Sequence, residues 1–284
     1  MNRSAAGLRE KVRHHLQTRR TAVAELRAQS YDVAIDAYAY FGNSADVLWS
    51  AAAPVRIGFT SGGGSTLYTE RIPFDPGRSI LANQARLLAP ILGETPELSA
   101  APPQGFQRDP QADAMADDFG KFIVFHVGPG LPHRDWPAEQ WIALGRRLQA
   151  DGYRLVFTGA SAEAKHVGVV REALGGDDLL GKFGLRGFAT VLSRAQGLVA
   201  IDTMAGHLAA WFQTPTAVVF AGAVPPLLWR PQQPFARTVT LPVGCAPCNR
   251  SRGCEAMTCL RGVRADTVYE TLRAMMAERR KSAA

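Results

Sequence analysis

Polar residues suited to binding an anion follow an apolar run in the C-terminal half of the chain. The segment Ile201-Asp-Thr-Met-Ala-Gly-His207 places Asp202 at the end of a predicted strand, directly before a predicted helix. The first N–H groups of a helix lack intrahelical partners and carry partial positive charge, so they attract anions. Thr203 is a candidate helix cap, Gly206 lets the backbone approach a ligand, and His207 lies one turn further on. The alternative is structural: two capping residues and a half-buried histidine.

A second loop with a suitable cation is Gly128-Pro-Gly-Leu-Pro-His-Arg-Asp-Trp-Pro137. Arg134 stands just before a predicted helix start, and a guanidinium binds phosphate through two parallel hydrogen bonds. The alternative is a surface arginine on a turn. Because both loops follow strands of one predicted sheet, we expect a shared diphosphate ligand. The motif GxxxxGK[ST] is absent, and Gly128 and Gly130 lack the third glycine of a dinucleotide fingerprint.

All four cysteines lie within fifteen residues, which argues against a disulfide framework spread over the fold. They are Cys245, Cys248, Cys254 and Cys259, with the spacing C-x2-C-x5-C-x4-C. Four thiolates suit a tetrahedral zinc or iron ion, and we expect such a site to be structural rather than catalytic. The alternative is four reduced thiols that pack a loop.

The elements around these residues alternate between strand and helix. Strands are predicted over residues 122–127, 153–157, 197–201, 216–220 and 237–241. One helix is predicted from Pro137 to about 151, and a second from the loop at 158–160 to about Leu174. Further helices are predicted over 185–195, 205–212 and 265–280. This order predicts an α/β fold with a doubly wound parallel sheet. Such sheets bind ligands beyond the carboxyl ends of their strands, where Arg134 and Asp202 are expected.

The N-terminal half gives a weaker pattern of the same kind. Helices are predicted over residues 1–29, 44–53 and 79–92, strands over 31–36 and 55–59, and a flexible loop over 60–65. Residues 94–119 are rich in Pro, Ala, Gln and Asp without clear periodicity. We therefore expect an N-terminal domain over 1–100, a linker over 101–119 and a C-terminal domain over 120–284.

The composition is that of a globular protein, and its charge is basic. The chain has 284 residues, of which 46% are hydrophobic, and a net charge of +7. Much of the excess lies near the two ends, at Arg3, Arg9, Lys11, Arg13, Arg19, Arg20, Arg273, Arg279, Arg280 and Lys281. No nucleic-acid-binding motif accompanies it, so we expect no nucleic-acid partner. Solvated helix faces are the favoured interpretation, and contact with an anionic membrane is the alternative.

The sequence shows no signal peptide, and no apolar run approaches the ~20 residues that span a bilayer. The expected location is the cytoplasm, with peripheral contact to the inner face of the membrane as the further alternative.

Several segments together resemble glycosyltransferase family 9, the bacterial heptosyltransferases. They are Arg134-Asp-Trp-Pro137, Asp202-Thr-Met-Ala-Gly-His-Leu-Ala-Ala210, Thr214-Pro-Thr216 and Trp229-Arg-Pro231. The resemblance runs from about Tyr31 to the C-terminus and is strongest over 122–260. It implies a GT-B fold of two Rossmann-like domains, the N-terminal one on the acceptor side. It also implies transfer of a heptose from ADP-heptose, with inversion, to a lipopolysaccharide core sugar or a protein hydroxyl, without a cofactor for the chemistry.

The resemblance also implies roles for individual residues. Asp202, Thr203 and His207 would hold the donor diphosphate, and Arg134 would neutralise the leaving ADP. The loop at Thr158 and Gly159, and Lys182, would lie near the nucleoside. Met204 stands where the family has glycine, and a side chain there would crowd the phosphates or alter the turn.

The N-terminus departs most from the family pattern. Family members begin with a strand and a Gly-Asp loop whose Asp is the proposed general base, and this chain has no counterpart. We therefore expect an incomplete N-terminal domain that lacks one strand–helix–strand unit of ~30 residues or more, and we assign no catalytic base. This departure favours an alternative function, a weakly active or inactive homologue that serves as a nucleotide-sugar-binding scaffold or partner subunit. A metal-dependent regulatory module built on the cysteines is a third hypothesis.

Overall fold

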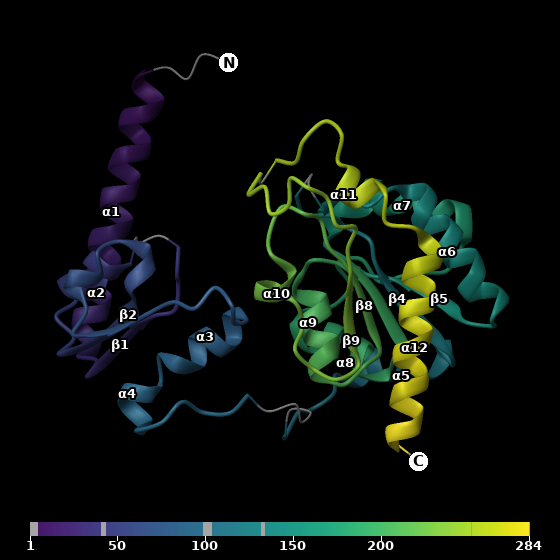
Figure 1. Cartoon of the computed structure of the whole chain (residues 1–284), viewed down its shortest axis with the longest axis horizontal. Coiled ribbons are helices and arrows are strands. Elements are labelled where there is room, and N and C mark those ends of the chain that lie inside the picture. The colour runs from purple at the N-terminus through teal and green to yellow at the C-terminus, as the bar shows by residue number, and fades with distance from the viewer. Residues whose placement is uncertain (1–4, 41–43, 99–103, 132–133, 251, 284) are drawn as a thin grey trace. The chain divides into compact units, whose positions relative to one another are not determined.

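The chain forms two compact units, residues 1–98 and 99–284. The structure is a computed structural model that describes residues 5–40, 44–98, 104–131, 134–250 and 252–283 (Figure 1). Within these ranges, no helix has the length and apolar character needed to cross a membrane.

The first unit is built on a parallel sheet of three strands within the described residues, in the order β1-β2-β3. The strands are β1 (Val33–Asp36), β2 (Val55–Phe59) and β3 (Glu70–Ile72), and the helices are α1 (Ala5–Gln29), α2 (Ala45–Ser50), α3 (Ile80–Arg86) and α4 (Ala89–Leu92). Ala39, Ile57, Phe59 and Leu87 form its buried core. The small sheet agrees with the expected N-terminal α/β domain of few strands.

One predicted helix of this unit is divided. The sequence predicts a single helix over 79–92, but the structure has α3 and α4 with a break at Leu87 and Leu88. Pro90 explains the break, because a proline inside a helix lacks an N–H donor and clashes with the carbonyl four residues earlier.

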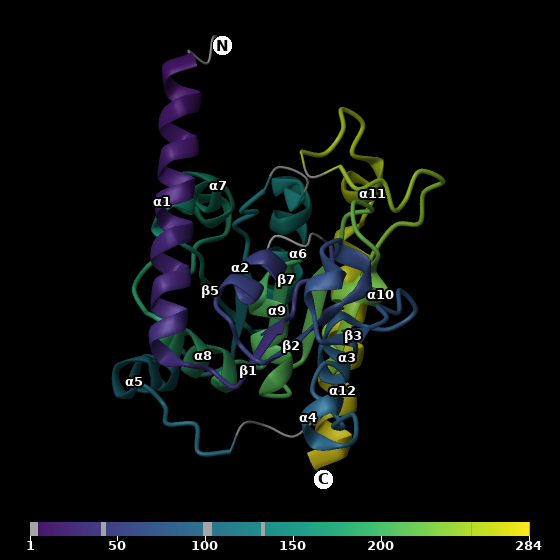
Figure 2. The same cartoon turned by 90° about the vertical axis from the view of Figure 1, so that its left-hand side faces the viewer.

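Helix α1 is only partly covered by the rest of its unit. In both views it extends beyond α2 and the strands (Figure 1, Figure 2). Near its C-terminal end, Arg19 pairs with Asp46 and Arg27 donates to the Ser50 carbonyl at 2.6 Å. Farther toward the N-terminus, Val12 and Leu16 are 50% and 46% exposed. The described N-terminal half of α1 therefore leaves an apolar pair in solvent.

The second unit contains a parallel sheet of six strands within the described residues, in the order β6-β5-β4-β7-β8-β9. The strands are β4 (Phe122–His126), β5 (Arg154–Phe157), β6 (Asp177–Asp178), β7 (Gly197–Ile201), β8 (Thr216–Val219) and β9 (Ala236–Val239). The helices are α5 (Pro110–Phe119), α6 (Ala138–Ala150), α7 (Ala164–Leu174), α8 (Leu185–Arg194), α9 (Met204–Trp211), α10 (Pro226–Trp229), α11 (Thr258–Arg261) and α12 (Ala265–Ala283). The predicted doubly wound sheet is confirmed.

The central strands are apolar throughout because helices cover both faces of the sheet. On β4, Ile123 and Phe125 point into one core with residues of α6, α7 and α12, whereas Phe122 and Val124 point into another with residues of α5, α8 and α9. This alternation follows from the two-residue period of a strand.

Residues 110–119 are helical, which corrects the expectation of irregular linker there. Asp109 caps α5 by accepting from the N–H groups of Gln111 and Ala112, both at 3.1 Å. Ala112 and Ala116 are buried, and Arg194 of α8 pairs with Asp113 at 2.8 Å. The helix was missed because its buried face consists mainly of alanine, which gives no clear apolar periodicity.

Candidate functional site

Three neighbouring strands of the second sheet end at one pocket. The sheet order places β5, β4 and β7 side by side, so Thr158, His126 and Asp202 follow or end adjacent strands. The pocket measures about 500 Å3 and is lined by His126, Thr158, Gly159, Ala160, Glu163, Leu179, Gly181, Phe183, Gly184, Leu185, Phe188, Val191 and Met204. Apolar walls with a few convergent polar groups are typical of small-molecule sites. A cavity thus lies beyond the ends of these strands, where the sequence predicts a ligand.

His126 forms a polar side of this pocket and was not predicted from the sequence. Its Nδ1 lies 3.0 Å from the Thr158 hydroxyl, and its ring lies against Phe188 with centroids 5.5 Å apart. Burial lowers the pKa of His126 to about 4, although the nearby Glu163 carboxylate acts in the opposite direction. The imidazole is therefore neutral at pH 7, and its face and Phe188 form an apolar surface.

The depressed pKa of His126 predicts a pH-dependent stability. Between pH 6.5 and about 4 the unfolded chain binds a proton at this position and the folded chain does not, so stability falls as the pH falls through this window. The loss attributable to His126 is about 3 kcal/mol at the acid end. Urea unfolding of wild type and His126→Gln at pH 7 and 4.5 measures it. An equal loss of stability in both proteins would contradict the assignment, since other groups titrate in both.

Glu163 lines the pocket and joins two loops. Its Oε1 accepts from the N–H of Gly130 at 3.2 Å, and its Oε2 accepts from the N–H of Ala160 at 2.9 Å. A Cβ at Gly128 would stand 2.2 Å from the carboxyl carbon of Glu163, so a larger residue there would displace this carboxylate. The loops after β4 and β5 are therefore held by one carboxylate. The sequence signal for this role is the position of Glu163, three residues after Ala160, since an acidic side chain there can accept from the N–H at the start of a helix.

Arg134 and Asp202 meet although 67 residues separate them in the sequence. The Arg134 Nη2 lies 3.4 Å from the Asp202 Oδ2, and the two side chains are 28% and 13% exposed. The Arg134 Nε is buried and has no hydrogen-bond partner among the described residues. The 3.4 Å contact with Asp202 leaves donor capacity for an anion on the terminal N–H groups of the partly exposed guanidinium. The predicted convergence of these two loops is observed, whereas the predicted contacts with a diphosphate stay a prediction.

Trp136 anchors the loop that carries Arg134. Its side chain is 1% exposed, its Nε1 donates to the Val263 carbonyl at 2.9 Å, and its ring contacts Trp141 with centroids 5.0 Å apart. A large buried side chain two residues from Arg134 restricts the positions available to the guanidinium.

The start of α9 differs in detail from the sequence-based expectation. Thr203 occupies the N-cap position, but its hydroxyl donates to the Ile201 carbonyl at 3.3 Å and caps no helical N–H. Gly206 is explained by packing, because a Cβ there would lie 2.8 Å from the Val218 side chain. The prediction that Thr203 caps the helix is therefore wrong. Gly206 allows α9 to pack closely against β8.

Some of the predicted site residues line the pocket, whereas Arg134, Asp202 and His207 are not among its lining residues. Met204 is 56% exposed and lines it, as do Thr158 and Gly159. Lys182 is exposed and does not line it, but it follows Gly181, whose N–H donates to the Gly159 carbonyl at 2.9 Å. Burial lowers the pKa of His207, opposed by Asp202 and by a hydrogen bond with the Trp229 backbone.

The four cysteines line one small cavity of about 70 Å3, together with Ala221, Gly222 and Ala223, which follow β8. All four are free thiols, and the Cys254 Sγ accepts from the Met257 N–H at 3.4 Å. Within the ranges that the structure describes, no three His, Cys, Asp or Glu side chains are arranged to hold a metal ion. The expected zinc or iron site stays a prediction.

Comparison with known proteins adds a family. Residues 19–257 match the model of glycosyltransferase family 9 (heptosyltransferase). The chain is 28% identical over 205 residues to lipopolysaccharide heptosyltransferase 1 of Pseudomonas aeruginosa, covering 70% of this chain and 57% of that protein. It is also 28% identical over 216 residues to the Escherichia coli K12 enzyme of the same name, covering 72% and 65%. The chain thus spans less than two thirds of the length of these relatives.

Solved structures share the fold. Escherichia coli ADP-heptose lipopolysaccharide heptosyltransferase II superposes with a TM-score of 0.72 at 20% identity, covering 94% of this chain and 82% of that one. Escherichia coli heptosyltransferase WaaC with ADP superposes with a TM-score of 0.68 at 22% identity, covering 96% and 79%. At these identities the likeness shows the fold: two α/β units with parallel sheets.

Proposed function

Because the chain belongs to glycosyltransferase family 9, we propose that it transfers a heptose from ADP-heptose to an acceptor hydroxyl, with inversion at the anomeric carbon. Its fold is the GT-B fold of the heptosyltransferases. Two observations support a donor site here most directly: the pocket at the ends of β4, β5 and β7, and the contact between Arg134 and Asp202 on the loops that follow β4 and β7.

The proposed donor nucleotide agrees with the chemistry of the pocket. Phe183, Phe188 and the neutral His126 give apolar surface for a purine, and the polar groups are few. The WaaC structures contain ADP or ADP-2-deoxy-2-fluoro heptose, and we extend this donor class to the present chain.

In the proposed reaction, the acceptor oxygen forms a bond to the anomeric carbon as the bond from that carbon to the diphosphate breaks. ADP leaves with the electron pair, and Arg134 stabilises the charge that develops on its phosphates. The acceptor proton passes to a base, to which we assign no carboxylate among the described residues. We propose a lipopolysaccharide core sugar as the acceptor, in preference to a protein hydroxyl, because the two relatives named above are lipopolysaccharide heptosyltransferases.

Calorimetric titration of the full chain with ADP, and with UDP as control, tests the donor site. We expect ADP to bind and UDP to bind at least tenfold more weakly, followed by heptose transfer in an assay with ADP-heptose and a core oligosaccharide. Binding without transfer would favour the scaffold function over the enzyme. Absence of ADP binding would overturn both.

We further propose that the four cysteines hold one structural zinc or iron ion. Support comes from their common cavity and from thiolate chemistry, since four sulfur ligands suit either metal. Such an ion would cross-link the loop over 245–259 beside the segment that follows β8, without a role in the transfer itself.

Metal content tests this site. We expect about one ion per chain in the purified protein by mass spectrometry, and loss of it in Cys248→Ser and Cys259→Ser with a lower thermal midpoint. Met257→Leu removes a neighbouring sulfur that is no thiolate, and it should keep the ion. A metal-free wild-type chain with four titratable thiols and unchanged stability in the serine variants would contradict the proposal.

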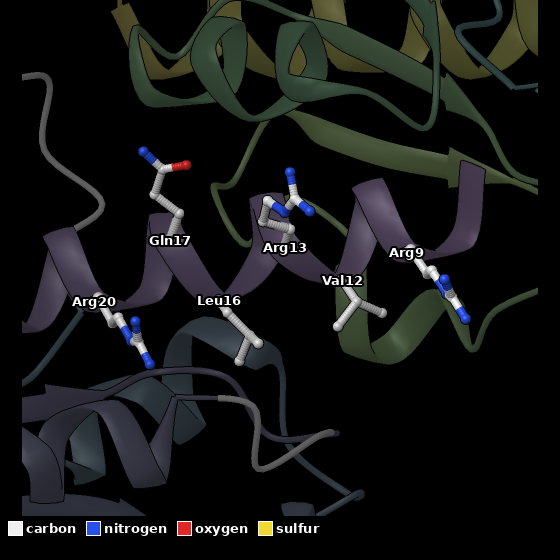
Figure 3. Close-up of a pocket in the computed structure, with 6 residues that line it drawn as sticks. All are labelled: Arg9, Val12, Arg13, Leu16, Gln17 and Arg20. Atoms are coloured by element: carbon white, nitrogen blue, oxygen red, sulfur yellow. The ribbon is translucent and has the colours of Figure 1, made fainter. Parts of the chain in front are cut away.

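We also propose that the uncovered half of α1 contacts an anionic membrane surface. Residues 9–20 contain five Lys or Arg and one Glu. Val12 and Leu16 lie among Arg9, Arg13 and Arg20 along this stretch (Figure 3). Apolar and basic side chains together favour an interface with anionic lipid, at roughly 1 kcal/mol for each cation near the surface.

Vesicle sedimentation checks this contact. We expect binding to vesicles with anionic phosphatidylglycerol and little binding to pure phosphatidylcholine. The double variant Arg9→Glu, Arg13→Glu should weaken binding at least tenfold, whereas the matched pair Arg279→Glu, Arg280→Glu on α12 should change it less than threefold. Equal effects of the two pairs would show that net charge alone is responsible.

A further inference from the structure

Two contacts join the loop that carries Arg134 to the start of α7. Glu163, the residue before α7, accepts from the Gly130 N–H at 3.2 Å. His166, three residues later, places its Nε2 3.0 Å from the Asp135 Oδ1. Residues three apart along a helix lie on the same face. The start of α7 therefore holds this loop at two points, and the second point is the residue next to Arg134.

The contact between His166 and Asp135 is a hydrogen bond of known direction. An ionised carboxylate only accepts hydrogen bonds, so the His166 Nε2 carries the hydrogen. The two side chains are 37% and 45% exposed, and pairs in contact with water add little to the stability of a fold. The effect of this hydrogen bond is therefore local, because it restricts where Asp135 can lie.

Helix α7 is a firm support for this hydrogen bond. Val167 and Val170, on the same helix, are each 1% exposed and lie in a core that they share with residues of β4, β5 and α6. Protein cores are close-packed, so α7 cannot shift without disturbing its neighbours. His166 thus presents its imidazole from a fixed element.

The restriction on Asp135 reaches Arg134 because the backbone around both residues is tightly turned. The Arg134 N–H donates to the Leu131 carbonyl at 2.9 Å, and the Trp136 N–H donates to the Arg134 carbonyl at 3.1 Å. A displacement of Asp135 would therefore move the backbone from which the Arg134 guanidinium extends.

We propose that His166 positions Arg134 for the donor diphosphate by holding Asp135. This inference rests on the proposed function, and specifically on Arg134 as the residue that binds the phosphates. His166 is not among the residues that line the pocket, so it acts through the loop and not by contact with the ligand. A cation that is already held in place loses less freedom on binding, which strengthens the binding of the diphosphate.

Charge and position predict opposite effects at Asp135. Its carboxylate is next to Arg134 in the sequence, and by charge alone it repels a diphosphate. Its removal would then strengthen ADP binding. If Asp135 instead serves to hold the loop, its removal weakens ADP binding, as removal of the His166 side chain does. The sign of the effect distinguishes the two.

Calorimetric titration of the full chain with ADP and with adenosine tests the inference. We expect His166→Ala and Asp135→Ala each to lose about fivefold in ADP affinity, and the double variant to lose no more than either one, because partners in one hydrogen bond are not additive. Adenosine has no phosphate, so its affinity should change less than twofold. Asp135→Asn keeps the accepting oxygen and should bind ADP at least as tightly as wild type. Lys165→Ala removes an exposed cation from the same turn and should leave ADP affinity unchanged.

Hydrogen exchange of the Arg134 and Trp136 amides, measured without nucleotide, tests the hold on the loop separately. We expect faster exchange in His166→Ala than in wild type, and wild-type exchange in Lys165→Ala.

The two measurements separate this inference from the proposed function. If wild type binds ADP, unchanged or higher ADP affinity in Asp135→Ala would overturn the positioning role and leave the proposed function standing. Additive losses in the double variant would overturn it too. A wild-type chain that binds no ADP would overturn the donor site. Faster exchange in His166→Ala would still support the hold on the loop in that case, and unchanged exchange would overturn it.

Discussion

Arg134→Ala should weaken ADP binding about 100-fold. The Arg134 side chain is 28% exposed, and its contact with Asp202 is 3.4 Å long, so its terminal N–H groups keep donor capacity for a phosphate. A hydrogen bond to a charged group contributes ~1.5–3 kcal/mol, and 1.4 kcal/mol corresponds to a factor of ten. Calorimetric titration with ADP measures the loss, and adenosine serves as the phosphate-free control ligand. Adenosine affinity should change less than threefold.

Two further variants make the result specific. Arg134→Lys keeps the charge but loses the planar fork, so it should recover part of the ADP affinity. Asp202→Asn should cost less than Arg134→Ala, because a carboxylate repels a diphosphate and Asp202 acts by positioning the guanidinium. An equal loss of ADP and adenosine affinity in Arg134→Ala would instead mean that the loop has been displaced, and the phosphate role would be wrong.

The strands of the second unit were predictable because each is a short, continuous apolar run. Residues 122–127, 197–201 and 216–220 were predicted as strands and correspond to β4, β7 and β8 within one residue at each end. Elements defined by their partners were not predictable. β6 has two residues and is defined by its pairing with β5. Helix α5 buries two alanines and one phenylalanine, which give no clear apolar period. Local periodicity does not report such contacts.

The candidate site shows the same division. Arg134 and Asp202 were predicted singly, from loops that follow strands, but their contact depends on β4 lying next to β7 in the sheet. His126 was recognisable as the one polar residue at the end of an apolar run, whereas Phe188 resembles any core residue of an amphipathic helix. Its role in the pocket becomes visible only when the ring of His126 is placed against it.

Trp136→Ala should lower the free energy of unfolding by about 3–5 kcal/mol, the range for large buried aromatic side chains. The indole is 1% exposed, contacts Trp141 and donates to the Val263 carbonyl, so its loss leaves both a cavity and an unpaired acceptor. Urea unfolding followed by far-ultraviolet circular dichroism measures the change. Trp211→Ala on α9, where the indole is 46% exposed, should change stability by no more than about 0.5 kcal/mol.

Trp136→Phe separates the anchoring role from bulk stability. Phenylalanine refills much of the space but leaves the Val263 carbonyl unpaired, at a cost of about 1–3 kcal/mol. If Trp136 fixes the loop that carries Arg134, ADP affinity should fall severalfold in this folded variant, while adenosine affinity should hold. Loss of stability with unchanged ADP affinity would mean that Trp136 acts only in core packing. The contact with Asp202 would then be what positions the guanidinium.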